Sequence, residues 1–230
     1  TTSTQADTVS LTRTGLATMT NSSGVLVWNP HNLLTYSNFA LGWSADTAQL
    51  TATGGFDGPV AALPATNFVP STNSVGTHRY RKGVTISGKT LTYGLIAKSN
   101  GYNQIGLRES SITGACAVLD LDTGLLVNTH NNSSISVSST SIEAMANGYY
   151  AISVTFVDTG TVSGTFGIYV TSGYTSGDVE TAKFAGDGTS GILVCAPHVY
   201  RSDLGGMAPV PADAQVAGST TYVPTTSAAV

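Results

Sequence analysis

Charged side chains are scarce in this sequence. Only 10% of its 230 residues are Asp, Glu, Lys or Arg, and nine basic against thirteen acidic residues give a formal net charge of −4. A surface that binds nucleic acid neutralises many phosphates with Lys and Arg, so this balance predicts no nucleic-acid partner. Hydroxyl and amide groups must cover the surface instead. Such a surface suits extended strands, and it suits a protein held in a large assembly.

Long apolar runs and cysteine motifs are also missing. No apolar run approaches the length needed to cross a bilayer, so we expect no contact with a membrane. Cys116 and Cys195 lie about eighty residues apart, each inside an apolar stretch. This placement favours buried thiols over a disulfide. No CxxC or HxxxH pair is present to build a zinc site.

Helical periodicity is nearly absent, whereas short β-rich segments recur every eight to twelve residues from His78 onward, separated by Gly, Asn, Asp or Ser. This spacing predicts an all-β fold, a β-sandwich, over residues 46–203. Residues 1–45 are expected to form an N-terminal β-hairpin and anchoring segment, with strands at 9–14, 16–20 and 25–28. Residues 54–76 are expected to form a loop, and residues 204–230 an extended C-terminal tail.

No catalytic signature stands out. The stretch "GDGTSG" at 186–191 lacks the lysine and the following helix of a phosphate-binding loop, so Asp187 and Gly188 are interpreted as a turn. Cys195 and His198 are three residues apart and would point to opposite faces of a regular strand, while Pro197 between them indicates an edge or a bulge. We therefore expect no enzymatic activity.

Aromatic side chains and neighbouring arginines are the best candidates for contact with a ligand. Sugar rings pack their C–H faces on Trp and Tyr, while amides and hydroxyls bind the ring oxygens. Each of these aromatic residues can equally belong to the core. The candidate ligand-binding residues are Trp43, Tyr80, Arg81, Tyr102, Arg108 and His198.

The acidic pair in "LDLDTG" offers a second kind of site. Asp120 and Asp122 share one face of a strand, and with a carbonyl or Asp187 they could coordinate calcium through hard oxygen ligands. The alternative is a strand that ends in an Asp-Thr-Gly turn. Calcium is the only cofactor that the sequence suggests.

Six patches taken together resemble a family of bacteriophage virion proteins, the head spike or head fibre proteins, whose jelly-roll domain is similar to carbohydrate-binding modules. The patches are "LTRTGLATMTNSSGVL" (11–26), "NLLTYSNF" with Trp43 (32–43), "AVLDLDTGLL" (117–126), "ANGYYAISVTF" (146–156), "GDGTSGILVCAPHVY" (186–200) and "TYVPT" (221–225). The family usually has Trp where this chain has Cys195 and Gln where it has His198, so a ligand contact on that strand does not carry over.

The resemblance implies that the β-sandwich is a jelly roll. It also implies a non-enzymatic structural protein, displayed on the virion surface as a capsid decoration or head fibre, that binds host glycans. We expect a homo-oligomer whose partners are other virion proteins, capsid or fibre subunits, together with a host surface polysaccharide. The alternative is a carbohydrate-binding adhesion module of a tail fibre or tailspike. A glycan-cleaving enzyme is the third hypothesis.

Overall fold

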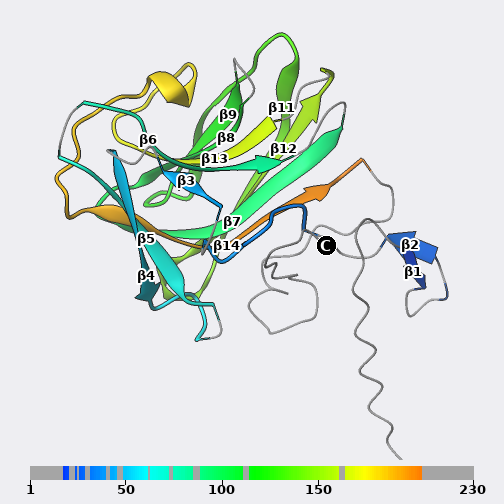
Figure 1. Cartoon of the computed structure of the whole chain (residues 1–230), viewed down its shortest axis with the longest axis horizontal. Coiled ribbons are helices and arrows are strands. Elements are labelled where there is room, and N and C mark those ends of the chain that lie inside the picture. The colour runs from blue at the N-terminus through cyan, green and yellow to red at the C-terminus, as the bar shows by residue number, and fades with distance from the viewer. Residues whose placement is uncertain are drawn as a thin grey trace, which may run out of the picture.

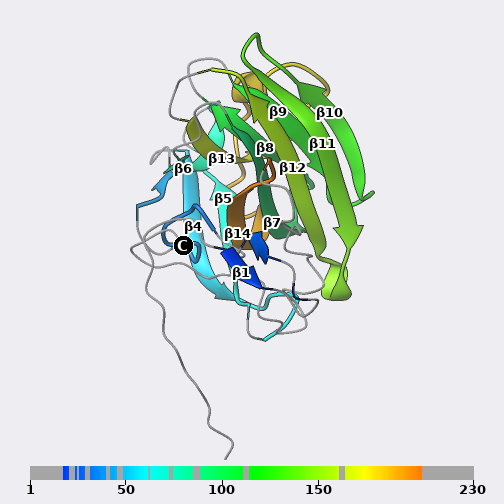
Figure 2. The ribbon, with the colours of Figure 1, turned by 90° about the vertical axis from the view of Figure 1, so that its right-hand side faces the viewer.

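The computed structural model describes residues 18–20, 24, 26–28, 32–39, 42–45, 49–61, 63–72, 75–84, 89–110, 114–160 and 164–203. Two six-stranded antiparallel sheets pack face to face and dominate this part of the chain (Figures 1 and 2). Two single-turn 3₁₀ helices, η1 (Ala146–Gly148) and η2 (Val179–Thr181), lie in connections between strands. No helix in the described ranges is long and apolar enough to span a membrane.

The two sheets are named after their long central strands. The β8 sheet has the order β10 (Leu125–His130), β9 (Ala115–Asp120), β8 (Gln104–Ser110), β13 (Gly164–Thr171), β6 (His78–Val84) and β3 (Ser44–Ala45). The β7 sheet has the order β11 (Ile135–Ala144), β12 (Tyr150–Asp158), β7 (Thr90–Asn100), β14 (Gly191–Arg201), β5 (Ala65–Pro70) and β4 (Leu50–Phe56).

The chain passes repeatedly from one sheet to the other. It crosses between β5 and β6, between β6 and β7, and between β7 and β8, and again between β10 and β11, β12 and β13, and β13 and β14. Strands that are distant in the sequence therefore become neighbours, as β13 does between β6 and β8. This is the jelly-roll sandwich that the sequence predicted.

The core lies between the sheets, where alternate residues of each strand point inward. Strand β12 contributes Ile152, Val154 and Phe156, and β13 contributes Phe166 and Ile168, all with at most 2% of their surface exposed. Burying each such side chain stabilises the fold by about 1.5 to 3 kcal/mol. Aromatic and β-branched residues on a period of two are what make these segments strands.

A second apolar layer covers the outer face of the β8 sheet. Cys116 and Val118 of β9 and Tyr169 of β13 pack there against Tyr174 and Val179, from the connection between β13 and β14. Strand β9 is therefore covered on both faces, which explains why it is apolar at successive positions. The same connection carries η2 and the charged residues of the candidate site.

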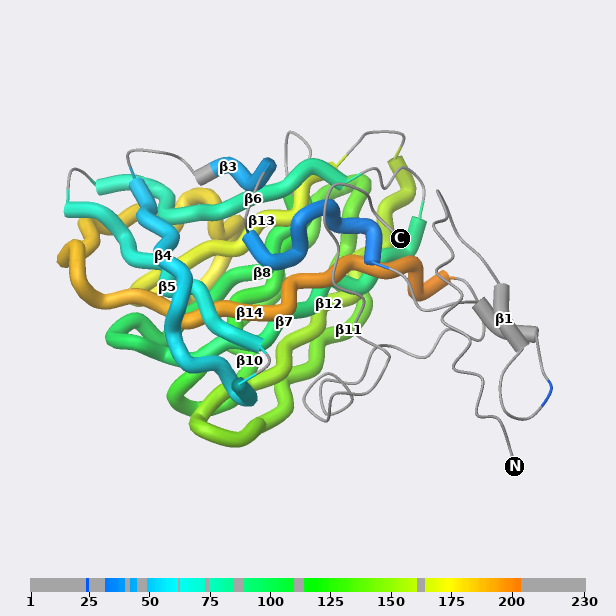
Figure 3. Tube along the Cα trace, turned by 60° about the horizontal axis from the view of Figure 1, so that its bottom comes forward, coloured from blue at the N-terminus to red at the C-terminus, as the bar shows by residue number. Residues whose placement is uncertain are grey.

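Two expectations about the chain organisation need correction. Residues 54–76 are not a loop throughout, because they contain the end of β4 and all of β5; Pro70 ends β5 and Pro64 precedes it, so neither proline interrupts the ladder. Residues 32–39 and 42–45 belong to the sandwich rather than to an anchoring segment, and residues 32–39 run beside β14 (Figure 3). Leu34 and Phe39 are part of the core, and the backbone N–H of Leu33 donates to the Val199 carbonyl at 2.7 Å.

The predicted N-terminal hairpin is present as β1 (Thr18–Thr20) paired antiparallel with β2 (Leu26–Trp28). The strand expected at 9–14 and the tail expected at 204–230 lie outside the described residues.

Candidate functional site

A buried ion pair holds the connection between β13 and β14 onto the β8 sheet. Arg108 on β8 donates two hydrogen bonds to the Asp178 carboxylate, Nε at 2.7 Å and an Nη at 2.8 Å. Burial alone would lower the pKa of Arg108, but its hydrogen bonds to Asp178 raise it overall. The same carboxylate accepts from the Glu180 N–H at 3.0 Å, so Asp178 also caps η2. The buried positive charge of Arg108 is thus paired with the negative charge of Asp178.

Glu180 connects this network to the neighbouring strands of the β8 sheet. Its carboxylate accepts from the Tyr169 hydroxyl at 2.6 Å and from the Arg79 guanidinium, while an Arg108 Nη lies 3.9 Å away. Strands β6, β8 and β13 each contribute one of these three partners. The polar connection is therefore fixed to three adjacent strands, which gives η2 a rigid base.

His78 fixes the opposite side of the same region. It is fully buried at the start of β6, with Nδ1 2.5 Å from the Gln49 carbonyl and Nε2 2.8 Å from the Phe184 carbonyl. Its ring also meets the Phe184 ring edge-on at a centroid distance of 4.4 Å. Three segments far apart in the sequence are held together in this way.

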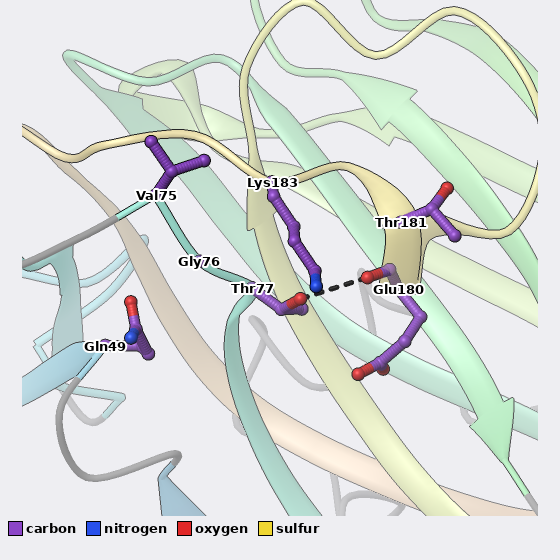
Figure 4. A pocket seen from close by; sticks show the side chains of 7 residues that line it. All are labelled: Gln49, Val75, Gly76, Thr77, Glu180, Thr181 and Lys183. Carbon is purple, nitrogen blue, oxygen red and sulfur yellow. Dashed lines mark hydrogen bonds between the residues drawn. The ribbon is translucent and has the colours of Figure 1, made fainter.

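An open polar cleft of about 640 Å³ lies between these segments (Figure 4). It is bounded by the residue before β4, by the approach to β6, and by η2 with the residues that follow. Its lining residues are Gln49, Val75, Gly76, Thr77, Glu180, Thr181 and Lys183.

Several polar groups in the cleft are already engaged within the protein. Gly76 exchanges both backbone hydrogen bonds with Phe184, at 3.0 and 3.2 Å. The Thr77 hydroxyl donates to the Glu180 carbonyl at 3.0 Å, and the Thr181 hydroxyl donates to the Asp178 carbonyl at 2.8 Å. Both threonine oxygens can still accept a hydrogen bond from a ligand.

Two side chains of the cleft remain directed to solvent. Lys183 is exposed, and its ammonium forms no hydrogen bond or ion pair with any residue that the structure describes. Val75 is 67% exposed and supplies an apolar wall. The cleft therefore combines a cation, hydroxyl acceptors and a small apolar surface.

The structure does not bring the six candidate ligand residues together. Trp43 is 9% exposed, stacks on Tyr80 at a centroid distance of 5.6 Å and donates its Nε1–H to the Tyr36 carbonyl at 2.7 Å. Tyr80 is half-buried and packs against the core. Both rings are therefore part of the sandwich interior, which corrects their interpretation as a ligand platform.

The other candidates are also dispersed. Arg108 is buried in its ion pair with Asp178, so its guanidinium is not open to a ligand. Tyr102 is half-buried, with its ring 5.2 Å from Phe184. Arg81 is half-buried on β6 and is not among the residues that line the cleft.

The expected geometry of Cys195 and His198 is wrong. A bulge at Ala196 and Pro197 shifts the register, so that Cys195 pairs with Ile96 and His198 with Gly94, which share a face of β7. Both side chains thus lie on the outer face of the β7 sheet. Burial raises the pKa of the Cys195 thiol to about 12 and lowers that of His198, so neither suits nucleophilic catalysis at neutral pH. His198 is only 6% exposed and offers no ligand contact.

The acidic pair forms a turn rather than a calcium site. One Asp120 oxygen accepts from the N–H groups of Asp122 and Thr123, both at 2.9 Å, and the other accepts from the Asn103 amide at 3.0 Å. Asp122 is exposed, and no group of three acidic, His or Cys residues converges within the described part of the chain. The hydrogen bonds of the Asp120 carboxylate are thus used to form the Asp-Thr-Gly turn, which was the alternative to a calcium site.

Two further expectations are confirmed. The Asp187 carboxylate accepts from the N–H groups of Thr189 and Ser190 at 2.8 and 2.7 Å, and Gly188 has a φ of +74°, as a turn requires. Hydrogen bonds from Ser190 and Thr189 hold the pKa of Asp187 at about 2. Cys116 and Cys195 are both buried and free, and belong to layers on opposite sides of the sandwich.

The residues that build the cleft were missed by the sequence analysis. The available signal was local charge density, because "GDVETAK" at 177–183 holds three charged residues in a chain where they are rare. Nothing in the sequence indicated that this segment would fold back over Arg79 and Arg108.

Comparison with known proteins adds little to this geometry. No family model matches the chain, and no curated protein matches it. A distant structural likeness is found to the N-terminal CBM22-1 and GH10 modules of the endo-1,4-β-D-xylanase 10B of Clostridium thermocellum, complexed with xylohexaose. The TM-score is 0.40 with 13% sequence identity, and the likeness covers 75% of this chain and 28% of that one.

Proposed function

We propose that this protein is a non-enzymatic virion component that binds host surface glycans through the cleft beside η2. The observation that carries the glycan part is the cleft itself, a polar hollow of about 640 Å³ on a rigid frame of ion-paired strands. Its hydroxyl oxygens, its ammonium and the Val75 methyls match the hydroxyls and C–H faces of a saccharide. The virion part is supported by the sequence resemblance and by the weakly charged chain.

The cleft is open and has no aromatic residue in its lining, so a single site should bind weakly. Weak sites become effective when many copies act together on a repeating polysaccharide, because each further contact is intramolecular. Display of many copies on one particle would meet that condition. Attachment to a tail fibre instead of the head would give the same advantage.

Affinity electrophoresis of the full chain through gels containing bacterial polysaccharides tests glycan binding. We expect retardation by at least one polysaccharide, and Val75→Asp should reduce it. Leu125→Asp is the matched control, because Leu125 is 64% exposed on the hairpin between β9 and β10. No retardation by any host polysaccharide at millimolar sugar would contradict the glycan part of the proposal.

Two further measurements test the remaining parts. Incubation with host capsule should release no reducing sugar, and turnover would overturn the non-enzymatic assignment. Antibodies against the chain should label purified phage particles in electron micrographs. Label on the tail would favour the adhesion module, and its absence from particles would contradict a virion role.

A further inference from the structure

We infer that the cleft selects acidic saccharides, with Lys183 binding a sugar carboxylate. This inference rests on the proposed function and names its ligand class. The chain as a whole carries a net charge of −4, so a local positive site needs a structural reason.

The reason lies in how the carboxylates near the cleft are partnered. Glu180 lies in the cleft wall, but its carboxylate is bound by Arg79 and Tyr169 over the β8 sheet. Figure 4 shows this carboxylate directed away from Lys183. Asp178 is likewise bound by Arg108. The two guanidinium and two carboxylate charges cancel one another, and neither acid neutralises the lysine.

Lys183 itself is placed to meet a ligand. Its side chain extends across the cleft toward Thr77 (Figure 4), and among the described residues its ammonium has no partner. An ammonium is a point charge with three donors, which suits one carboxylate. Thr77 and Thr181 also line the cleft, so the same ligand can place sugar hydroxyls on their oxygens.

The charge count favours a carboxylated sugar over a more highly charged ligand. One ammonium balances one carboxylate, while the other lining residues, apart from the ion-paired Glu180, are uncharged and suit hydroxyls and C–H groups. A phosphomonoester would bring about two negative charges, and no further cation of the lining residues could balance the second.

Isothermal titration of the full chain with oligogalacturonate, and with the neutral galactose oligomer of the same length, tests the inference. We expect tighter binding of the uronate, with a preference that weakens as salt is added. Lys183→Gln should lower uronate affinity about fivefold and leave the neutral sugar unaffected. Lys183→Arg should retain most of the preference, and Lys98→Gln on β7 is the control that removes the same charge elsewhere.

The outcomes separate this inference from the proposed function. Equal affinity for both oligomers, unchanged by Lys183→Gln, would overturn the acidic preference and leave glycan binding standing. Failure of both oligomers and of all polysaccharides to bind would overturn glycan binding as well. Binding of dextran sulfate as tight as that of the uronate would show a general polyanion site and would contradict selection of a carboxylate.

Discussion

Two neighbouring residues of β8 show two ways of burying a charge in this sandwich. Arg108 points to the outer face, is 4% exposed and has Asp178 as a bidentate partner. Glu109 points between the sheets, is 1% exposed, and neither of its oxygens has a hydrogen-bond partner in the described structure. The first arrangement fixes the connection between β13 and β14 onto the sheet. The second leaves an uncompensated acid at one end of the core.

The surroundings of Glu109 explain why it stays unpaired. Asp158 of β12 is its acidic neighbour across the sandwich, and the buried Tyr93 hydroxyl also lacks a partner. Lys82 also faces inward from the β8 sheet, but Phe166 lies between it and Glu109. The Lys82 ammonium lies over the Tyr36 ring instead, 5.3 Å from the ring centroid. Burial first, and then the charge of Asp158, raise the pKa of Glu109 to about 7.

Breaking the ion pair between Arg108 and Asp178 should have the largest effect on stability. Arg108→Leu leaves the Asp178 carboxylate without its cation and should destabilise the fold by about 3 to 5 kcal/mol, measured by urea unfolding at pH 7. The double variant with Asp178→Leu should recover part of that loss, because both charges are then gone. A single variant as stable as the wild type would show that the ion pair does not hold the segment.

The unpaired carboxyl of Glu109 should make the stability of the fold depend on pH. Because the folded pKa of Glu109 is about 7 and the unfolded one about 4.5, the folded state binds the extra proton between these values. The protonated Glu109 carboxyl therefore makes its full contribution to the free energy of unfolding below pH 4.5. This contribution falls, by roughly 3 kcal/mol in total, as the pH rises to 7. Urea unfolding across this range measures the fall.

Glu109→Gln should remove most of this fall and stabilise the protein at pH 8. Glu143→Gln on β11 is the control, because Glu143 is exposed. Identical pH profiles for the wild type and Glu109→Gln would contradict this account of the buried acid.

Two of the buried tyrosines, Tyr169 and Tyr93, offer a matched comparison of smaller size. Tyr169 donates to the Glu180 carboxylate, so Tyr169→Phe should destabilise the protein by about 2 kcal/mol, since a charged acceptor loses its donor.

The Tyr93 hydroxyl has no partner in the described structure, so Tyr93→Phe should stabilise the protein by about 1 kcal/mol. Thermal unfolding of both variants measures the difference, and equal losses for the two would show that Tyr93 is as well partnered as Tyr169.

The same contrast shows what the sequence can predict. Period-two patterns in segments such as "YYAISVTFV" predict strands because one face of each is buried, and turn residues such as Asp187 and Gly188 place the boundaries. The β-sandwich was predictable for this reason, whereas its jelly-roll topology was expected from the family resemblance. Strand β5 was not predicted because the prolines at its two ends, Pro64 and Pro70, are typical of loops.

The candidate site was not predictable in the same way. Arg108 was named as a ligand residue because it lies near aromatic residues in the sequence, but its partner lies seventy residues further along the chain, at Asp178. The opposite-face argument for Cys195 and His198 failed at a bulge, which a single residue of extra chain creates. Long-range pairing and local register shifts depend on the assembled sheets, and short-range patterns do not contain them.

Mapping backbone amide shifts by nuclear magnetic resonance, during titration of the full chain with an acidic oligosaccharide, tests the central claim most directly. A cleft that binds saccharides predicts shifts concentrated at residues 75–77 and 180–183, and Lys183→Gln should reach the same shifts only at about fivefold higher oligosaccharide concentration. Shifts confined to the surroundings of Arg81 on β6, or no shifts with any sugar that binds the protein in gels, would contradict it.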